Sequence, residues 1–93
     1  MSIAVLATNQ PHLASQVRQE WDPVREQQVL LAPEGVLVLN QTGATILGLC
    51  DGERTVTEIM EELRGQYNHV ADDEVQDFLT RLVAKRWVEL HDE

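Results

Sequence analysis

Residues 28–40 read QVLLAPEGVLVLN and carry the clearest strand signal of the chain. Two apolar runs, residues 28–32 and 36–40, flank the triplet PEG at residues 33–35. Proline presets the backbone angle of a tight turn, and glycine tolerates the positive φ that such a turn often needs. The pattern therefore predicts a β-hairpin. Because both strands are apolar at most positions, we expect one face to lie on helices and the other to serve a partner, another strand or a second copy of the chain.

Two further segments have strand character. Residues 17–22, VRQEWD, alternate in part between apolar and polar side chains, and the dipeptide Asp22-Pro23 then signals a turn. Residues 87–90 form a short closing strand or an extended end. Residues 1–11 read as a flexible N-terminal tail, which leaves residues 12–93 as a single domain.

Helical patterns follow the hairpin. Asn40 can cap a first helix, which ends at Asp51-Gly52 because glycine adopts the left-handed conformation of a helix end. Thr55 and Glu58 have the spacing of a capping box and begin a second helix. The third helix has an acidic first turn from Asp72, which suits the helix dipole, and an apolar stripe over residues 75–83.

Strands that precede helices in this way are typical of the α+β class. The sequence predicts a small winged-helix-like domain in which a three-stranded antiparallel sheet is followed by three helices.

The charge balance limits the possible partners. The chain has 93 residues, with 7 Lys and Arg against 16 Asp and Glu and a formal net charge of −9. An acidic surface repels phosphate backbones and anionic lipids and favours basic partners, although a solvated surface without specific meaning explains it equally well. A DNA-binding winged helix presents Arg, Lys, Asn or Gln to the bases, whereas the third helix begins with acidic side chains. We therefore expect no nucleic-acid and no membrane partner.

The compartment is expected to be the cytoplasm. The apolar run at residues 3–7 is too short for a signal-peptide core or a membrane span. Cys50 is the single cysteine, so the chain cannot form an internal disulfide.

We find no constellation of residues that predicts catalysis. Cys50 precedes Asp51, and an adjacent carboxylate raises the pKa of a thiol, so a buried, inert cysteine is expected. His12, His69 and His91 are far apart in the sequence and share no metal-ligand spacing. The glycines are scattered and form no phosphate loop. We predict a binding protein without enzymatic activity, cofactor or metal.

Two features could carry binding. The apolar strand from Val36 to Leu39 could accept another chain as an added strand along its edge, and the stripe of the third helix is wide enough to serve both core and groove. The alternative is that the strand and the helical stripe are both buried entirely in the core and leave no surface for a ligand. Trp21 and Trp87 are of a residue type enriched at binding hot spots, but core packing is the expected role of each.

The stretch from Pro11 to Leu90 resembles the PqqD family. The hairpin turn LLAPEG at residues 30–35, the LN at 39–40 and the ILGLCDG at 46–52 occur in the order and spacing of that family. Other matching positions are Pro11, His12, Leu13, Arg18, Trp21, Asp22, Arg54, Thr55, Val56, Ile59, Leu63, Tyr67, Phe78, Leu79 and Leu82. Arg86 departs from the pattern, because the family usually has glycine there, and this bears on the geometry of the C-terminal turn.

The resemblance implies a peptide chaperone of pyrroloquinoline quinone (PQQ) biosynthesis. Such a protein binds the precursor peptide PqqA and presents it to the radical S-adenosylmethionine enzyme PqqE, which cross-links a Glu and a Tyr of the peptide and holds the cofactors itself. The peptide is expected between the third strand and the third helix. The implied binding residues are Val36, Leu37, Val38, Leu39, Asn40, Asp72, Val75, Phe78, Leu79 and Leu82.

Two other functions remain open. A homodimeric structural or regulatory module could use the same strand edge for a second copy of the chain, by strand pairing or exchange. The third hypothesis is a small enzyme, but the sequence contains no catalytic motif that would support it.

Overall fold

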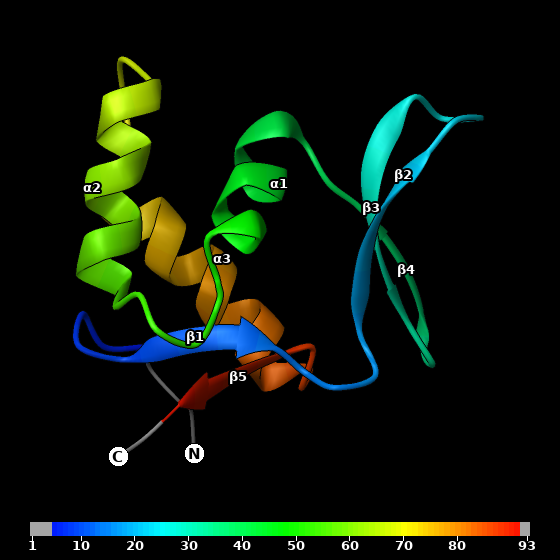
Figure 1. Ribbon diagram of the computed structural model, residues 1–93, viewed down its shortest axis with the longest axis horizontal. Coiled ribbons are helices and arrows are strands. Elements are labelled where there is room, and N and C mark those ends of the chain that lie inside the picture. The colour runs from blue at the N-terminus through cyan, green and yellow to red at the C-terminus, as the bar shows by residue number, and fades with distance from the viewer. Residues whose placement is uncertain (1–4, 92–93) are drawn as a thin grey trace.

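The computed structural model describes residues 5–91 and has the α+β architecture that the sequence predicts (Figure 1). A three-stranded antiparallel sheet precedes three helices in the chain, and a further pair of strands joins the two ends of the described chain. The elements are β1 (Gln10–Leu13), β2 (Arg18–Asp22), β3 (Gln27–Ala32), β4 (Gly35–Val38), α1 (Gln41–Gly48), α2 (Val56–Gln66), α3 (Asp72–Ala84) and β5 (Val88–His91).

The two sheets lie on different sides of the helices. In Figure 1 the sheet of order β2-β3-β4 stands beside α1, whereas β1 and β5 run side by side beneath the helices. No helix within residues 5–91 is both long and apolar enough to cross a membrane.

The predicted hairpin is β3 and β4. These strands pair from Val29 opposite Val38 to Ala32 opposite Gly35, which leaves Pro33 and Glu34 in the turn. Leu30 is completely buried on the inner face of the sheet. The outer face of β4 is open, because the side chains of Val36 and Val38 are 53% and 42% exposed.

The predicted tail is wrong from residue 5 onward, and residues 1–4 lie outside the described part of the chain. Strand β1 begins at Gln10 and pairs with β5, so the boundary that the sequence predicts at residue 12 falls inside a strand. Val5 is 4% exposed, and its carbonyl accepts a hydrogen bond from Gln76 Nε2 at 3.3 Å. The partners of this segment are distant in the sequence, such as Gln76 for Val5 and Val56 for Asn9, so no local pattern can indicate them.

The predicted caps of α1 and α2 are confirmed. Asn40 Oδ1 accepts a hydrogen bond from the Gly43 amide at 2.7 Å, which satisfies one of the unpaired donors at the start of α1. Thr55 Oγ1 accepts from the Glu58 amide, and Glu58 Oε1 accepts from the Thr55 amide at 2.8 Å. This reciprocal pair is the capping box that the spacing predicts.

Helix α3 ends in a Schellman motif, at the position where the resemblance leads us to expect glycine. The Trp87 amide donates to the Leu82 carbonyl at 2.9 Å, and the Arg86 amide donates to the Val83 carbonyl at 3.0 Å. Arg86 has φ +65°, a left-handed conformation that glycine adopts without steric cost. The turn geometry is therefore retained with arginine, at a cost in backbone energy.

We predict that Val5→Asp destabilises the protein and that Leu6→Asp does not. Val5 is buried against the core, whereas the neighbouring Leu6 is 58% exposed. A buried unpaired carboxylate should lower the free energy of unfolding by about 2–4 kcal/mol, and the exposed one by less than about 0.5 kcal/mol. Urea unfolding followed by circular dichroism measures both, and equal effects would show that residue 5 does not pack on the domain.

We also predict that Arg86→Gly stabilises the protein. Removal of the left-handed strain should outweigh the greater freedom of glycine in the unfolded chain and raise the free energy of unfolding by roughly 0.5–1 kcal/mol. Arg86→Ala is the matched control, because it removes the same side chain and keeps the strain. A gain in Arg86→Ala equal to that in Arg86→Gly would locate the effect in the side chain rather than the backbone.

Candidate functional site

The register of β4 leaves the backbone of two residues directed away from β3. The Leu39 amide donates to the Gln28 carbonyl at 2.9 Å. In an antiparallel pair, hydrogen-bonded and non-hydrogen-bonded residues alternate, so Leu37 bonds to β3 as Leu39 does, while Val38 and Val36 do not. Within residues 5–91 no strand pairs with the other edge of β4. The amides and carbonyls of Val36 and Val38 therefore form a free edge.

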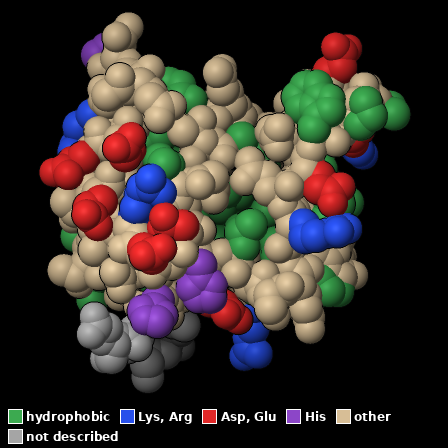
Figure 2. Space-filling model, viewed as in Figure 1, with side chains coloured by type: hydrophobic (Ala, Val, Ile, Leu, Met, Phe, Trp, Pro, Cys, Tyr) green, Lys and Arg blue, Asp and Glu red, His purple; other side chains and the backbone are tan. Residues whose placement is uncertain are grey.

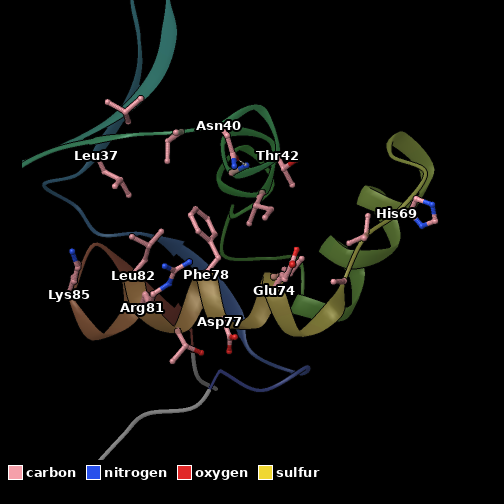
Figure 3. Close-up of a pocket in the computed structure, with 18 residues that line it drawn as sticks. Leu37, Asn40, Thr42, His69, Glu74, Asp77, Phe78, Arg81, Leu82 and Lys85 are labelled. Carbon is pink, nitrogen blue, oxygen red and sulfur yellow. Dashed lines mark hydrogen bonds between the residues drawn. The ribbon is translucent and has the colours of Figure 1, made fainter. Parts of the chain in front are cut away.

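A groove of about 940 Å³ adjoins this edge. The segment from Leu37 to Asn40 forms one wall and α3 forms the other (Figure 3). The bottom is apolar, with contributions from β4 and the residue after it, from α1, from the α2–α3 connection and from α3. These apolar residues are Leu37, Leu39, Ile46, Val70, Val75, Phe78 and Leu82. A free strand edge beside an apolar groove can bind an extended peptide through its backbone and its side chains together.

Gly43 lets α1 approach α3 closely. A Cβ atom at this position would lie 3.3 Å from Phe78 Cζ and 3.1 Å from Asn40 Oδ1. Any side chain at residue 43 would displace either the aromatic ring or the helix cap. The half-buried Phe78 ring thus lies under the start of α1, at the middle of the groove (Figure 3).

The charges along the rim of the groove are ordered by sign. Glu74 and Asp77 line the part formed by the first half of α3, and Arg81 and Lys85 line the part formed by its second half. All four are exposed, and none belongs to an ion pair within the described chain. The groove consequently has an acidic end beside the α2–α3 connection and a basic end beside β4.

Most of the residues proposed from sequence line this groove. The structure brings together Leu37, Val38, Leu39, Asn40, Val75, Phe78 and Leu82. Three others do not line it. Asp72 Oδ1 accepts a hydrogen bond from Arg64 Nη2 of α2 at 2.6 Å, Leu79 is completely buried in the core, and the Val36 side chain belongs to the outer face of the sheet. Val36 contributes to the edge through its backbone alone.

Sequence reasoning pointed to the acidic start of α3 as a possible attraction for a basic peptide, but it did not identify the basic part of the rim or the part of the wall that lies outside β4 and the apolar stripe. Arg81 and Lys85 flank that stripe at helical spacing, a signal that could have found them. The remaining wall residues come from α1 and the α2–α3 connection, whose approach to the groove only the folded chain shows. The lining residues not anticipated are Thr42, Gly43, Ile46, His69, Val70, Ala71, Thr80, Arg81 and Lys85.

Cys50 is inert, as its sequence neighbours predict. Burial, together with the charge of Asp51, raises the pKa of the Cys50 thiol to about 12. Its Sγ donates a hydrogen bond to the Ile46 carbonyl at 3.2 Å. A thiol in this state supplies almost no thiolate near neutral pH and is not a nucleophile.

Two of the histidines, His12 and His91, lie closer together than their sequence positions indicate. The pairing of β1 with β5 sets Gln10, His12, Glu89 and His91 on one face of the two-stranded sheet. His12 Nε2 is 4.0 Å from Glu89 Oε1. Residues 5–91 nevertheless contain no group of three or more His, Cys, Asp or Glu side chains that could hold a metal ion.

The two tryptophans have different environments. Trp87 is buried in the core, as expected, but the prediction of core packing is wrong for Trp21, which is 55% exposed. Trp21 lies at the outer end of the β2–β3 hairpin, where Figure 2 shows a group of exposed hydrophobic side chains. It borders a second, shallower depression against α1.

Comparison with solved structures defines the class of this domain. It is similar to the solution NMR structure of the PqqD truncation of Methylobacterium extorquens PqqCD, described as a functional, stand-alone recognition element of ribosomally synthesized and post-translationally modified peptides. The TM-score is 0.79 at 32% identity, over 92% of this chain and 95% of the other. The heterocyclase TruD is similar over 88% of this chain but only 11% of its own, with a TM-score of 0.64 and 28% identity. The fold is that of a recognition element for modified peptides.

Sequence comparison identifies the family. The family model of coenzyme PQQ synthesis protein D (PqqD) matches residues 27–88. A PqqA binding protein of Azotobacter vinelandii is 36% identical over 83 residues, which cover 87% of this chain and 90% of that protein. A PqqA binding protein of Pseudomonas fluorescens is 40% identical over 75 residues, with coverages of 78% and 82%. The chain belongs to the PqqD family.

Proposed function

We propose that this protein is a peptide chaperone of PQQ biosynthesis that binds PqqA as an added strand on β4 and presents it to PqqE. One observation carries the proposal: the free backbone groups of Val36 and Val38 lie along an apolar groove whose other wall is α3. The relatives named as PqqA binding proteins support the identity of the peptide.

The physical basis of binding is strand addition. Each backbone hydrogen bond to the added strand contributes about 0.5–1.5 kcal/mol net, independent of the peptide sequence. Selectivity comes from side chains that reach the apolar bottom of the groove around Phe78 and Leu82. This division suits a domain that has to hold a peptide firmly and leave its reacting residues to another protein.

In this proposal the protein does not catalyse a reaction and functions in the cytoplasm. Binding of the peptide by a domain that also contacts PqqE raises the local concentration of substrate at the enzyme. The chemistry and the cofactors belong to PqqE. The inert Cys50 thiol agrees with a role in binding.

We predict that Val38→Pro weakens PqqA binding and that Val38→Ala does not. Proline removes the outward amide of residue 38 and no hydrogen bond to β3, and an edge strand tolerates it when the lost donor faces outward. Calorimetric titration with synthetic PqqA should show roughly a threefold to tenfold loss of affinity for Val38→Pro. Val38→Ala keeps the amide and should remain within about twofold of the wild type.

Equal affinity of folded Val38→Pro and wild type would refute strand addition at this edge. Sedimentation of the same samples reports whether a second copy of the chain occupies the edge instead. If the wild type is a dimer that does not bind PqqA, and a monomeric variant does bind it, the homodimeric module would be favoured.

We further predict that the protein accelerates cross-linking of PqqA by PqqE. The PqqA concentration is kept below the Kd of PqqE alone for the peptide. Under these conditions the wild-type protein should raise the rate of cross-linking, and Val38→Pro should raise it less, in proportion to the amount of peptide bound. Mass spectrometry of the cross-linked peptide measures both rates. A rate unchanged by the wild-type protein, under conditions where calorimetry shows bound PqqA, would remove the presenting role.

A further inference from the structure

The order of charge along the groove has a fixed direction relative to β4. Gly43 lies against Phe78, so the start of α1, which follows β4, faces the middle of α3. Figure 3 shows Leu37 near Leu82 and Lys85, and Glu74 on the other side of Phe78. Strand β4 therefore runs from the basic end of the groove toward the acidic end.

The two charged ends are unusual for so acidic a chain. Arg81 and Lys85 are two of only 7 basic residues in a protein of net charge −9, and both line the groove. Within the described chain neither belongs to an ion pair, although acidic side chains are abundant. Four of the other arginines are paired with Asp or Glu. The two groove cations are thus available to a ligand.

From this order we infer that the groove selects peptides by charge polarity. The bound strand carries a basic residue on its N-terminal side, beside Glu74, and an acidic residue on its C-terminal side, beside Arg81 and Lys85. The direction follows from antiparallel addition to β4, which is the pairing used throughout this sheet and the more stable one per residue. The inference rests on the proposed function and specifies the class of peptide that the same groove takes.

Helix and strand geometry set the spacing of the two peptide charges. Glu74 precedes Arg81 by seven residues and Lys85 by eleven, which at about 1.5 Å per residue correspond to roughly 10–16 Å along α3. A strand advances about 3.3 Å per residue, so this span equals about three to five peptide residues. Side chains that face α3 recur at every second residue. A spacing of about four residues meets both conditions.

The test uses two short synthetic peptides of identical composition, built on alternating threonine and valine. In one peptide a lysine precedes a glutamate by about four residues, and in the other the two are exchanged. Affinities are measured by NMR titration of the wild-type protein, of Arg81→Glu and of Arg18→Glu. Arg18→Glu is the matched control, because it changes the net charge equally on the outer face of the sheet, away from the groove.

The lysine-first peptide should bind the wild type about threefold to tenfold more tightly than the glutamate-first peptide. Arg81→Glu should abolish or reverse this preference, and Arg18→Glu should keep it. Equal affinities, a preference for the glutamate-first peptide, no resonance shift with either peptide, or equal effects of the two variants would each overturn the inference.

PqqA is titrated in parallel to separate this inference from the proposed function. If the protein binds PqqA but does not distinguish the two charge orders, the proposed function stands and the inference of charge polarity is refuted. If the protein does not bind PqqA, the proposed function is refuted, whatever its preference between the synthetic peptides.

Discussion

The hydrogen bond from the Leu39 amide to the Gln28 carbonyl is the constraint on which the site depends. It fixes the register of β3 on β4, and the register decides which backbone groups stay unpaired. A shift of one residue would direct the amides of Leu37 and Leu39 to the open edge and would also exchange the two faces of the strand. Leu39, now 3% exposed, would lose its place in the core. The packing of the core and the position of the binding edge are thus set by the same pairing.

The helices then complete a groove that the sheet alone could not form. Asn40, two residues after the end of β4, caps α1 by accepting a hydrogen bond from the Gly43 amide. The absence of a side chain at Gly43 brings α1 close to Phe78. Strand edge, helix cap and α3 therefore meet at one place, and an extended peptide can contact all three. The same fold within the much longer heterocyclase TruD shows that the domain also occurs as part of an enzyme chain.

Local features were predictable from the sequence. The hairpin turn at residues 33–35, the Asn40 cap and the Thr55–Glu58 capping box each depend on residues a few positions apart, and the structure confirms them. Leu37 to Asn40, Val75, Phe78 and Leu82 were found for the same reason, since they belong to one strand with its continuation and to one helical stripe. The pairing of β1 with β5 was not predictable, because it joins Gln10 to His91 across nearly the whole chain.

Burial of single residues was also hard to predict when it depended on the surroundings of an element. Tryptophan is a residue type expected in a core, but Trp21 lies at the end of the β2–β3 hairpin, which extends beyond the helices. Asp72 has the charge expected of a peptide contact, but Arg64 of α2 binds it outside the groove. In both cases the residue type suggested a plausible role, but the neighbours that determine the role come from other elements and could not be predicted from the sequence.

Hydrogen exchange of the β4 amides, with and without PqqA, reports directly whether the peptide adds as a strand to β4. In the free protein the amides of Leu37 and Leu39 should exchange slowly, because they bond to β3, and those of Val36 and Val38 should exchange fast. Strand addition predicts that PqqA slows exchange at Val36 and Val38. Bound PqqA that leaves the exchange of these two amides unchanged would contradict the account and locate the peptide elsewhere on the domain.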